Sequence, residues 1–374
     1  MNRPDPQTPP GTPEDFPARR PAAPPPASLR RGAVSQPPNR FAATHREALP
    51  ELEDLEPEPL PRTEFIPDHS VSLITFNDSP DLGFAASLNP YRGCEHGCIY
   101  CYARPTHEYL GYSVGLDFES RILVKERAPE LLRRELAAPG WKPQVLALSG
   151  VTDPYQPVER RWRLTRRCLE VLAEFRQPVQ VVTKNHLVTR DADLLAELTR
   201  HRAAAVAISL TTLDPALRAV LEPRTSPLAA RLAAVRALAA AGVPVGVLLA
   251  PIIPGLNEHE IPRLLSAAAA AGARFAALQM LRLPGAVAPL FVEWLERHFP
   301  DRREKVLGRI RALRGGRLND PRFGTRMNGE GPYAAQIRHW FEVACRRAGI
   351  SRDWPELSTA AFRRPGGTQL EMPL

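Results

Sequence analysis

The chain has 374 residues, of which 44% are hydrophobic and 24% charged, as expected for one large globular domain with tails. No apolar run reaches the ~18 residues of a membrane-spanning helix, and the N-terminus lacks the apolar core of a signal peptide. Because the chain has only five cysteines, a disulfide framework is excluded, and we expect a cytoplasmic protein without membrane contact. A formal net charge of +8 permits a nucleic-acid partner.

The first part of the chain is rich in proline. Residues 1–62 hold 16 of the 41 prolines and few aromatic residues, which predicts a disordered tail. Residues 63–84 are expected to form an N-terminal extension with a short strand at 72–76, closed by a turn signal at 77–80. A core barrel is then predicted over 85–300 and a C-terminal cap over 301–374.

Three of the five cysteines fall within eight residues, as Cys94, Cys98 and Cys101. Thiolates so close together can converge on one site, and sulfur ligands select zinc, copper(I) or iron–sulfur clusters. Structural zinc needs a fourth ligand, for which only His96 and His107 are near in the sequence. A four-iron four-sulfur (4Fe-4S) cluster can instead be held by three cysteines, leaving one iron open. Zinc binding and three unrelated buried thiols remain the alternatives.

Apolar runs recur along the core with helical patterns between them. The predicted strands are 85–88, just before the cysteines, and 145–148, 179–183, 205–210, 243–250 and 275–280. An amphipathic helix is indicated between two of them by Leu164, Cys168, Leu172 and Phe175, which share one helical face. Six strands alternating with helices predict a partial (β/α)6 TIM barrel.

In parallel barrels the active site gathers at the C-terminal ends of the strands. Polar residues follow the second to the sixth predicted strand at this position, in segments 149–159, 183–186, 209–212, 251–258 and 279–282. We therefore expect the cysteine loop and these segments to form one site.

The spacing CxxxCxxC, with Tyr100 before the last cysteine, resembles the cluster loop of the radical S-adenosylmethionine (SAM) superfamily. Over residues 63–362 the chain is similar to the spore photoproduct lyase-like, or DNA repair photolyase, branch and to an uncharacterised bacterial subfamily within it. The stretches that carry the similarity are NPYRGCEHGCIYCYARPTHEYLG, TDPYQPVE, EPRTSP, APIIPGLNEHE and RFGTRMNGEGPY.

The resemblance implies an enzyme that cleaves SAM reductively to a 5′-deoxyadenosyl radical, which abstracts hydrogen from a substrate such as DNA or another nucleic acid. It also implies an external electron donor of the flavodoxin or ferredoxin type. Cys94, Cys98 and Cys101 would ligate the 4Fe-4S cluster. The residues expected to bind SAM are Tyr100 against the cofactor, Ser149, Gly150 and Thr152 at its amino group, Lys184 at its carboxylate, Ser209 at the ribose, and Ile252 and Ile253 at the adenine.

One departure from the branch concerns the hydrogen donor. Spore photoproduct lyases carry a cysteine beside the turn after the second strand, whereas residues 149–151 contain no thiol. Cys168 and Cys345 both lie at helical spacing from apolar residues and are predicted to be core residues. Tyr155 is the candidate hydrogen donor in place of the missing cysteine.

The predicted cap begins with a helix at 302–313 and continues into an arginine-rich loop. Arginines alternate with Phe323 and Tyr333, a pattern that could hold a phosphate backbone and stack a base, or could pack on the barrel mouth.

The sequence leaves two alternatives to a nucleic-acid-modifying enzyme. One is a non-catalytic zinc or iron–sulfur protein that binds nucleic acid, and the other is a radical SAM enzyme with a peptide or small-molecule substrate.

Overall fold

The computed structural model describes residues 31–42 and 60–365. Its main sheet has seven strands in the order β10-β9-β8-β7-β6-β3-β2. These strands are β2 (Ile74–Phe76), β3 (Ala86–Leu88), β6 (Leu146–Leu148), β7 (Val179–Thr183), β8 (Ala204–Ser209), β9 (Val245–Ile252) and β10 (Phe275–Met280). The six strands β3, β6, β7, β8, β9 and β10 pair in parallel, and β2 pairs antiparallel with β3. The predicted partial barrel of six βα units is confirmed.

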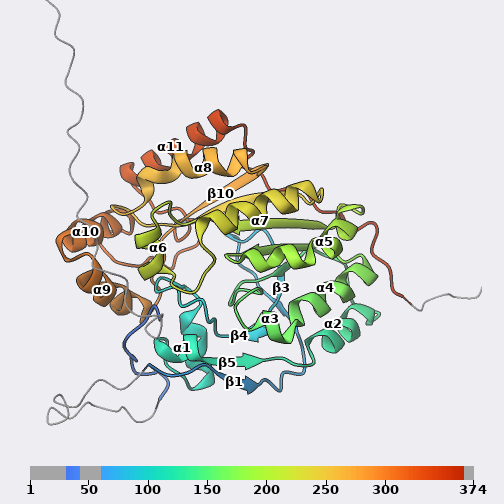
Figure 1. The fold of residues 1–374 in the computed structure, drawn as a ribbon. Helices are drawn as coiled ribbons and strands as arrows, with labels where there is room; N and C mark the ends of the chain where they lie inside the picture. Colours follow the sequence, from blue (N-terminus) through green and yellow to red (C-terminus); the bar gives the residue numbers. More distant parts are fainter. Residues whose placement is uncertain (1–30, 43–59, 366–374) are drawn as a thin grey trace, which may run out of the picture.

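Helices return the chain between the parallel strands and cover the outside of the sheet (Figure 1). The longer ones are α2 (Ala128–Ala137), α4 (Leu164–Phe175), α5 (Ala192–Thr199), α7 (Leu228–Ala240), α8 (Ile261–Ala270) and α9 (Val287–His298). Short helical segments complete the connections: η3 (Arg104–Leu110), α1 (Leu116–Ser120), α3 (Glu159–Trp162), η4 (His186–Asp191), α6 (Pro215–Leu221), η5 (Glu258–Glu260) and η6 (Pro300–Arg302). The predicted amphipathic helix is α4, whose apolar face is buried.

The main core lies between the sheet and these helices. All six residues of β8 are buried, as is typical of a parallel strand covered on both faces. Cys168 on α4 is fully buried in this core, and Cys345 is 1% exposed there. Both cysteines therefore pack as small apolar residues, as predicted.

A second, three-stranded sheet was not predicted. It has the order β1-β5-β4 and consists of β1 (Glu64–Pro67), β4 (Tyr91–Arg92) and β5 (Arg121–Val124). Strands of two to four residues are too short to show a periodic pattern in the sequence. This sheet matters for the site because β4 ends directly before the cysteine loop.

Residues 31–42, named here the strap, lie within the predicted tail and pack on the rest of the chain. The backbone amides of Gly32 and Ala33 donate hydrogen bonds to the Glu119 carboxylate at 2.9 and 2.8 Å, and Ala33 is 1% exposed. The disorder prediction considered only apolar content, whereas backbone donors bonded to a buried carboxylate hold the strap. Most of the remaining predicted tail lies outside the described residues.

The C-terminal part packs on the barrel. It contains α10 (Arg303–Leu313), close to the predicted helix at 302–313, and α11 (Pro332–Ala348), which lies beside α8 (Figure 1). Ile337, Phe341 and Cys345 of α11 belong to the same apolar core as the sheet. No helix in the described parts of the chain is long and apolar enough to cross a membrane.

Candidate functional site

The cysteine loop lies between β4 and η3. Cys94 and Cys98 are buried, Cys101 is partly buried, and all three are free of disulfide bonds. Gly97 has a φ of +66°, and a Cβ atom there would lie 2.7 Å from the Glu119 carboxylate. The loop therefore needs glycine at this position, both for its left-handed backbone and for its close approach to Glu119.

A fully buried arginine, Arg104, binds the backbone of the cysteine loop. The Arg104 guanidinium donates to the Cys98 carbonyl from Nε at 3.0 Å and from Nη2 at 2.9 Å, and also to the carbonyls of Val114 and Gly115. It forms an ion pair with Glu119, and both side chains are 0% exposed. Because charge-assisted hydrogen bonds are strong and directional, this pair fixes the backbone at the middle cysteine.

The strap packs on the same pair. Glu119 accepts from Gly32 and Ala33 of the strap as well as from Arg104. A Cβ atom on Gly32 would lie only 1.7 Å from the Gly97 carbonyl oxygen, so the two backbones are in contact. The strap therefore shields the cysteine loop on the side of Glu119.

The turn after β6 supports the loop from the other side. The Thr152 hydroxyl donates to the Gly93 carbonyl at 2.6 Å, and the Gln156 side chain donates to the same carbonyl at 3.2 Å. Gln156 also accepts from the Glu95 amide at 2.9 Å. Thr152, predicted to contact the SAM amino group, thus contacts the cysteine loop directly.

The backbone of this turn has an unusual conformation. Ser149 has a φ of 153° and Gly150 a φ of 121°, a region that residues with a Cβ rarely adopt. The Ser149 hydroxyl donates to the Thr152 carbonyl at 3.2 Å, and the Tyr102 hydroxyl donates to the Gly150 carbonyl at 2.8 Å. Strained backbone held by such contacts clusters at binding sites, which agrees with the predicted role of this turn.

Lys184, at the end of β7, faces the loop as well. Its ammonium lies 5.9 Å from the centre of the Tyr100 ring. The Tyr100 hydroxyl donates to Glu222, which also accepts from Thr211 at 3.1 Å and forms a buried ion pair with Arg231. Tyr100 is therefore held in one orientation beside a cation.

Ser209, at the end of β8, has a buried hydroxyl without a hydrogen-bond partner among the described residues. Its carbonyl accepts from Arg231 at 3.0 Å. A buried hydroxyl left unsatisfied is costly, which is expected where a ligand supplies the partner. Ile252 and Ile253, where β9 ends, are both 0% exposed.

His96 links the loop to the ends of β6 and β7. Its Nδ1 lies 3.4 Å from Asp153, which accepts from the Thr183 hydroxyl at 2.7 Å and from the Lys184 amide at 2.8 Å. Burial opposes charge on both side chains, but their mutual attraction, and for His96 also Cys94, raises the pKa of His96 and lowers that of Asp153. The two side chains therefore favour each other's charged form.

Sequence reasoning missed the residues that support the cysteines. These are Arg104, Glu119, Asp153, Glu222 and Arg231. Three of them carried a signal, since Arg104 lies in the stretch NPYRGCEHGCIYCYARPTHEYLG, Asp153 lies in the polar turn after the second predicted strand, and Glu222 begins the stretch EPRTSP. Glu119 carried none, because its partners lie up to 87 residues away.

Tyr155, the predicted hydrogen donor, is fully buried in the main core. Burial, and then the carboxylates of Asp191 and Glu159, raise the pKa of its hydroxyl. This location favours a packing role over contact with a substrate. Tyr155 as hydrogen donor stays a prediction.

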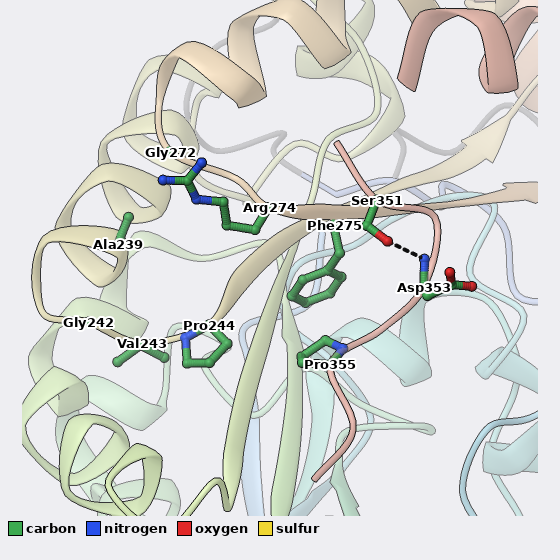
Figure 2. A pocket seen from close by; sticks show the side chains of 10 residues that line it. All are labelled: Ala239, Gly242, Val243, Pro244, Gly272, Arg274, Phe275, Ser351, Asp353 and Pro355. Carbon is green, nitrogen blue, oxygen red and sulfur yellow. Dashed lines mark hydrogen bonds between the residues drawn. The ribbon is translucent and has the colours of Figure 1, made fainter. Parts of the chain in front are cut away.

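A surface cavity of about 470 Å³ lies where β9 and β10 begin (Figure 2). Its lining includes Pro244 before β9, Phe275 at the start of β10, and Ser351 and Asp353 after α11. The N-terminal ends of barrel strands generally serve stability. This cavity is therefore separate from the candidate site.

Across the described residues, no group of three His, Cys, Asp or Glu side chains is arranged to hold a single metal ion. Tetrahedral zinc gathers its sulfur ligands within about 4 Å of each other, since each Zn–S bond is about 2.3 Å long. A cubane cluster spreads its cysteines around separate irons. The three cysteines supply sulfur ligands that either group could use.

Residues 88–268 match the family model of the radical SAM superfamily. This stretch, just under half of the chain, therefore carries a radical SAM domain, which includes the cysteine loop and the strand ends from β6 to β9. Members of this family use a 4Fe-4S cluster with SAM and need an external electron donor. The match confirms the predicted family and its cofactors, while the roles of single residues stay predictions.

Among curated proteins, the chain is similar to an uncharacterized protein of Mycobacterium tuberculosis, with 40% identity over 222 residues. That match covers 59% of this chain and 65% of the relative, just under two thirds of its length. An uncharacterized protein of Methanocaldococcus jannaschii is 29% identical over 173 residues, 46% of this chain and 62% of that protein.

Among solved structures, the fold is similar to spore photoproduct lyase complexed with a dinucleoside spore photoproduct. The TM-score is 0.54 at 16% identity, covering 78% of this chain and 82% of the lyase. A variant of the same lyase gives a TM-score of 0.56 at 17% identity over similar shares of both chains. At this identity the likeness shows a shared fold.

Proposed function

We propose that the protein is a radical SAM enzyme whose cluster is held by Cys94, Cys98 and Cys101. The observation that carries the proposal is the cysteine loop, which Arg104 and Glu119 fix beside the C-terminal ends of the strands. Three thiolates leave one iron of a 4Fe-4S cluster open to a further ligand. A purely structural site would not need polar side chains such as Lys184 at the same edge of the sheet.

The surrounding residues fit SAM. The unsatisfied Ser209 hydroxyl is available for the ribose, and Lys184 carries a point charge suited to the SAM carboxylate. The turn with Ser149, Gly150 and Thr152 would receive the amino group. Ile252 and Ile253 would meet the adenine, and Tyr100 would pack against the cofactor.

When bound, the cluster supplies one electron for reductive cleavage of SAM to a 5′-deoxyadenosyl radical that abstracts hydrogen from the substrate. The role of the protein is to hold the cluster and SAM and to exclude water from them. Cys98 is 8% exposed and Tyr100 is 7% exposed, so both lie away from bulk solvent. Glu222 and Arg231 keep Tyr100 in place, and the Arg104–Glu119 pair keeps the loop in place.

A nucleic-acid substrate is the finer part of this proposal and is supported by the fold shared with the lyase. The arginines of the cap do not add to that support. Arg322 pairs with Asp320 and Glu330, and Arg326 pairs with Asp81, so carboxylates already compensate both charges. Their phosphate-binding role stays a prediction, and a small-molecule or peptide substrate is the competing one.

Anaerobic reconstitution with iron and sulfide tests the function. We expect about four irons and four sulfides per chain, and release of 5′-deoxyadenosine when SAM and dithionite are added. Adding damaged DNA should stimulate turnover and transfer deuterium from labelled DNA into deoxyadenosine. Colourless protein with stoichiometric zinc and no affinity for SAM would instead establish the zinc-binding alternative.

Replacing Lys184 with glutamine should weaken SAM binding roughly tenfold or more, because an ion pair to the SAM carboxylate is lost. Affinity is measured by anaerobic calorimetry on the reconstituted protein. Lys142→Gln is the matched control, since Lys142 is exposed and the change in charge is the same. Equal SAM affinity in the Lys184 variant and the wild type would refute this role.

A further inference from the structure

Arg282 lies two residues after the end of β10, beside Tyr102 and Met327. Its guanidinium lies 5.3 Å from the centre of the Tyr102 ring, and its Nη1 contacts the Met327 sulfur at 3.6 Å. Its Nε is buried and has no hydrogen-bond partner among the described residues, none of whose carboxylates forms an ion pair with it. Arg282 itself is only partly buried, and a buried donor such as its Nε is costly to leave unsatisfied.

Two other arginines, Arg314 and Arg326, lie near Arg282. Arg326 forms an ion pair with Asp81 at 2.5 Å, while Arg314 donates to the carbonyls of Leu281, Thr325 and Arg326. Burial, and then the charge of Arg326, lower the pKa of Arg282. Asp81, whose charge also acts on Arg282, already accepts from Arg326 and from a backbone amide of the cap, so positive charge is in excess at Arg282.

This excess charge borders the radical SAM site. Tyr102 follows the ligand Cys101 in the chain, and its hydroxyl bonds to the Gly150 carbonyl in the strained turn after β6. Tyr102 is 43% exposed, so a molecule entering from solvent can stack on its ring. A group bound at Arg282 would therefore sit beside the cysteine loop, on the side of the barrel mouth that β10 forms.

We propose that Arg282 and Tyr102 form a subsite for an oxyanion of the substrate, a phosphate or a carboxylate. A planar guanidinium can donate to two oxygens of such a group, and Tyr102 can support the adjoining part of the molecule. The proposal deepens the function proposed above and rests on it for the identity of the substrate. The subsite itself consists of residues of this chain and does not depend on the cluster.

The test is anion binding by the full-length reconstituted protein, measured by anaerobic calorimetry. The probes are inorganic phosphate, acetate and a thymidine dinucleoside monophosphate, which distinguish a phosphate, a carboxylate and a phosphodiester. Arg282→Gln should weaken the best-bound probe roughly 10- to 100-fold, as expected for loss of hydrogen bonds to a charged group. Arg282→Lys should restore part of that loss, because the charge returns without the planar donors.

The matched control is Arg274→Gln. Arg274 stands just before β10, on the rim of the cavity where β9 and β10 begin, and is exposed (Figure 2). The Arg274→Gln substitution makes the same change in net charge and should alter probe affinity less than twofold. Thermal unfolding of every variant shows whether the fold is kept.

Two results would overturn the subsite. One is a wild-type protein that binds none of the three probes, and the other is an Arg282→Gln variant that binds them as the wild type does. A variant that loses SAM affinity but keeps probe affinity would also overturn it, because Arg282 would then serve the cofactor. Release of deoxyadenosine without substrate reports on the proposed function separately, so the two failures are distinguishable.

Discussion

Replacing Cys98 with alanine is expected to leave a folded protein that neither assembles a 4Fe-4S cluster nor releases deoxyadenosine from SAM. Two thiolates cannot hold the cluster that three hold, so the loss should be complete rather than graded. The loop should keep its shape, because Arg104 binds the backbone carbonyl of Cys98 and not its sulfur. Iron and sulfide content, and the spectrum of the reduced protein, measure the result.

Cys168→Ala is the matched control for this variant. Cys168 is also buried, but it lies on α4 in the apolar core, away from the loop. Its truncation should cost about 1 kcal/mol of unfolding free energy and leave the cluster content unchanged. Wild-type iron content and SAM cleavage in Cys98→Ala would contradict the assignment of the three ligands.

Much of the fold could be predicted because buried parallel strands are continuous apolar runs. Strands β7 and β10 have the predicted bounds, and β9 differs from its predicted range by two residues at each end. The small sheet of β1, β5 and β4 could not be found in this way. Its strands are short, and their pairing brings together β1 and β5, which are far apart in the sequence.

The site was predictable to the extent that chemistry is concentrated in short motifs. Three cysteines within eight residues define a ligand set by themselves, and Lys184 and Ser209 were found because they follow predicted strands. The supporting contacts are of another kind. Tyr100 and Glu222 are 122 residues apart, and Gly32 and Glu119 are 87 apart, so only the folded chain brings them together.

The strap also depends on contacts that cannot be predicted from the sequence. Its proline-rich surroundings indicate disorder, because composition records how much apolar surface a segment can bury. The strap is instead held by hydrogen bonds to one carboxylate, and the residue that supplies this carboxylate, Glu119, also pairs with Arg104. A single buried ion pair therefore connects the N-terminal segment to the cysteine loop.

Glu119→Gln should accordingly destabilise the protein by about 3 to 5 kcal/mol, because it leaves the Arg104 guanidinium buried without a counter-charge. Glutamine has nearly the same shape as glutamate, so the effect is one of charge and not of packing. The strap should also detach more often, since its two backbone amides lose a charged acceptor. Denaturant unfolding measures the first effect, and the rate of proteolytic cleavage within residues 31–42 measures the second.

Glu174→Gln provides the comparison, because Glu174 also pairs with an arginine, Arg133, but at the surface. The two side chains are 36% and 49% exposed, and an exposed ion pair contributes only about 0 to 1 kcal/mol. If Glu119→Gln cost no more than Glu174→Gln and left the strap equally resistant to protease, the Arg104–Glu119 pair would not be what holds the loop. A large loss of stability together with early cleavage in the strap, and reduced cluster content after reconstitution, would show that one carboxylate supports both segments.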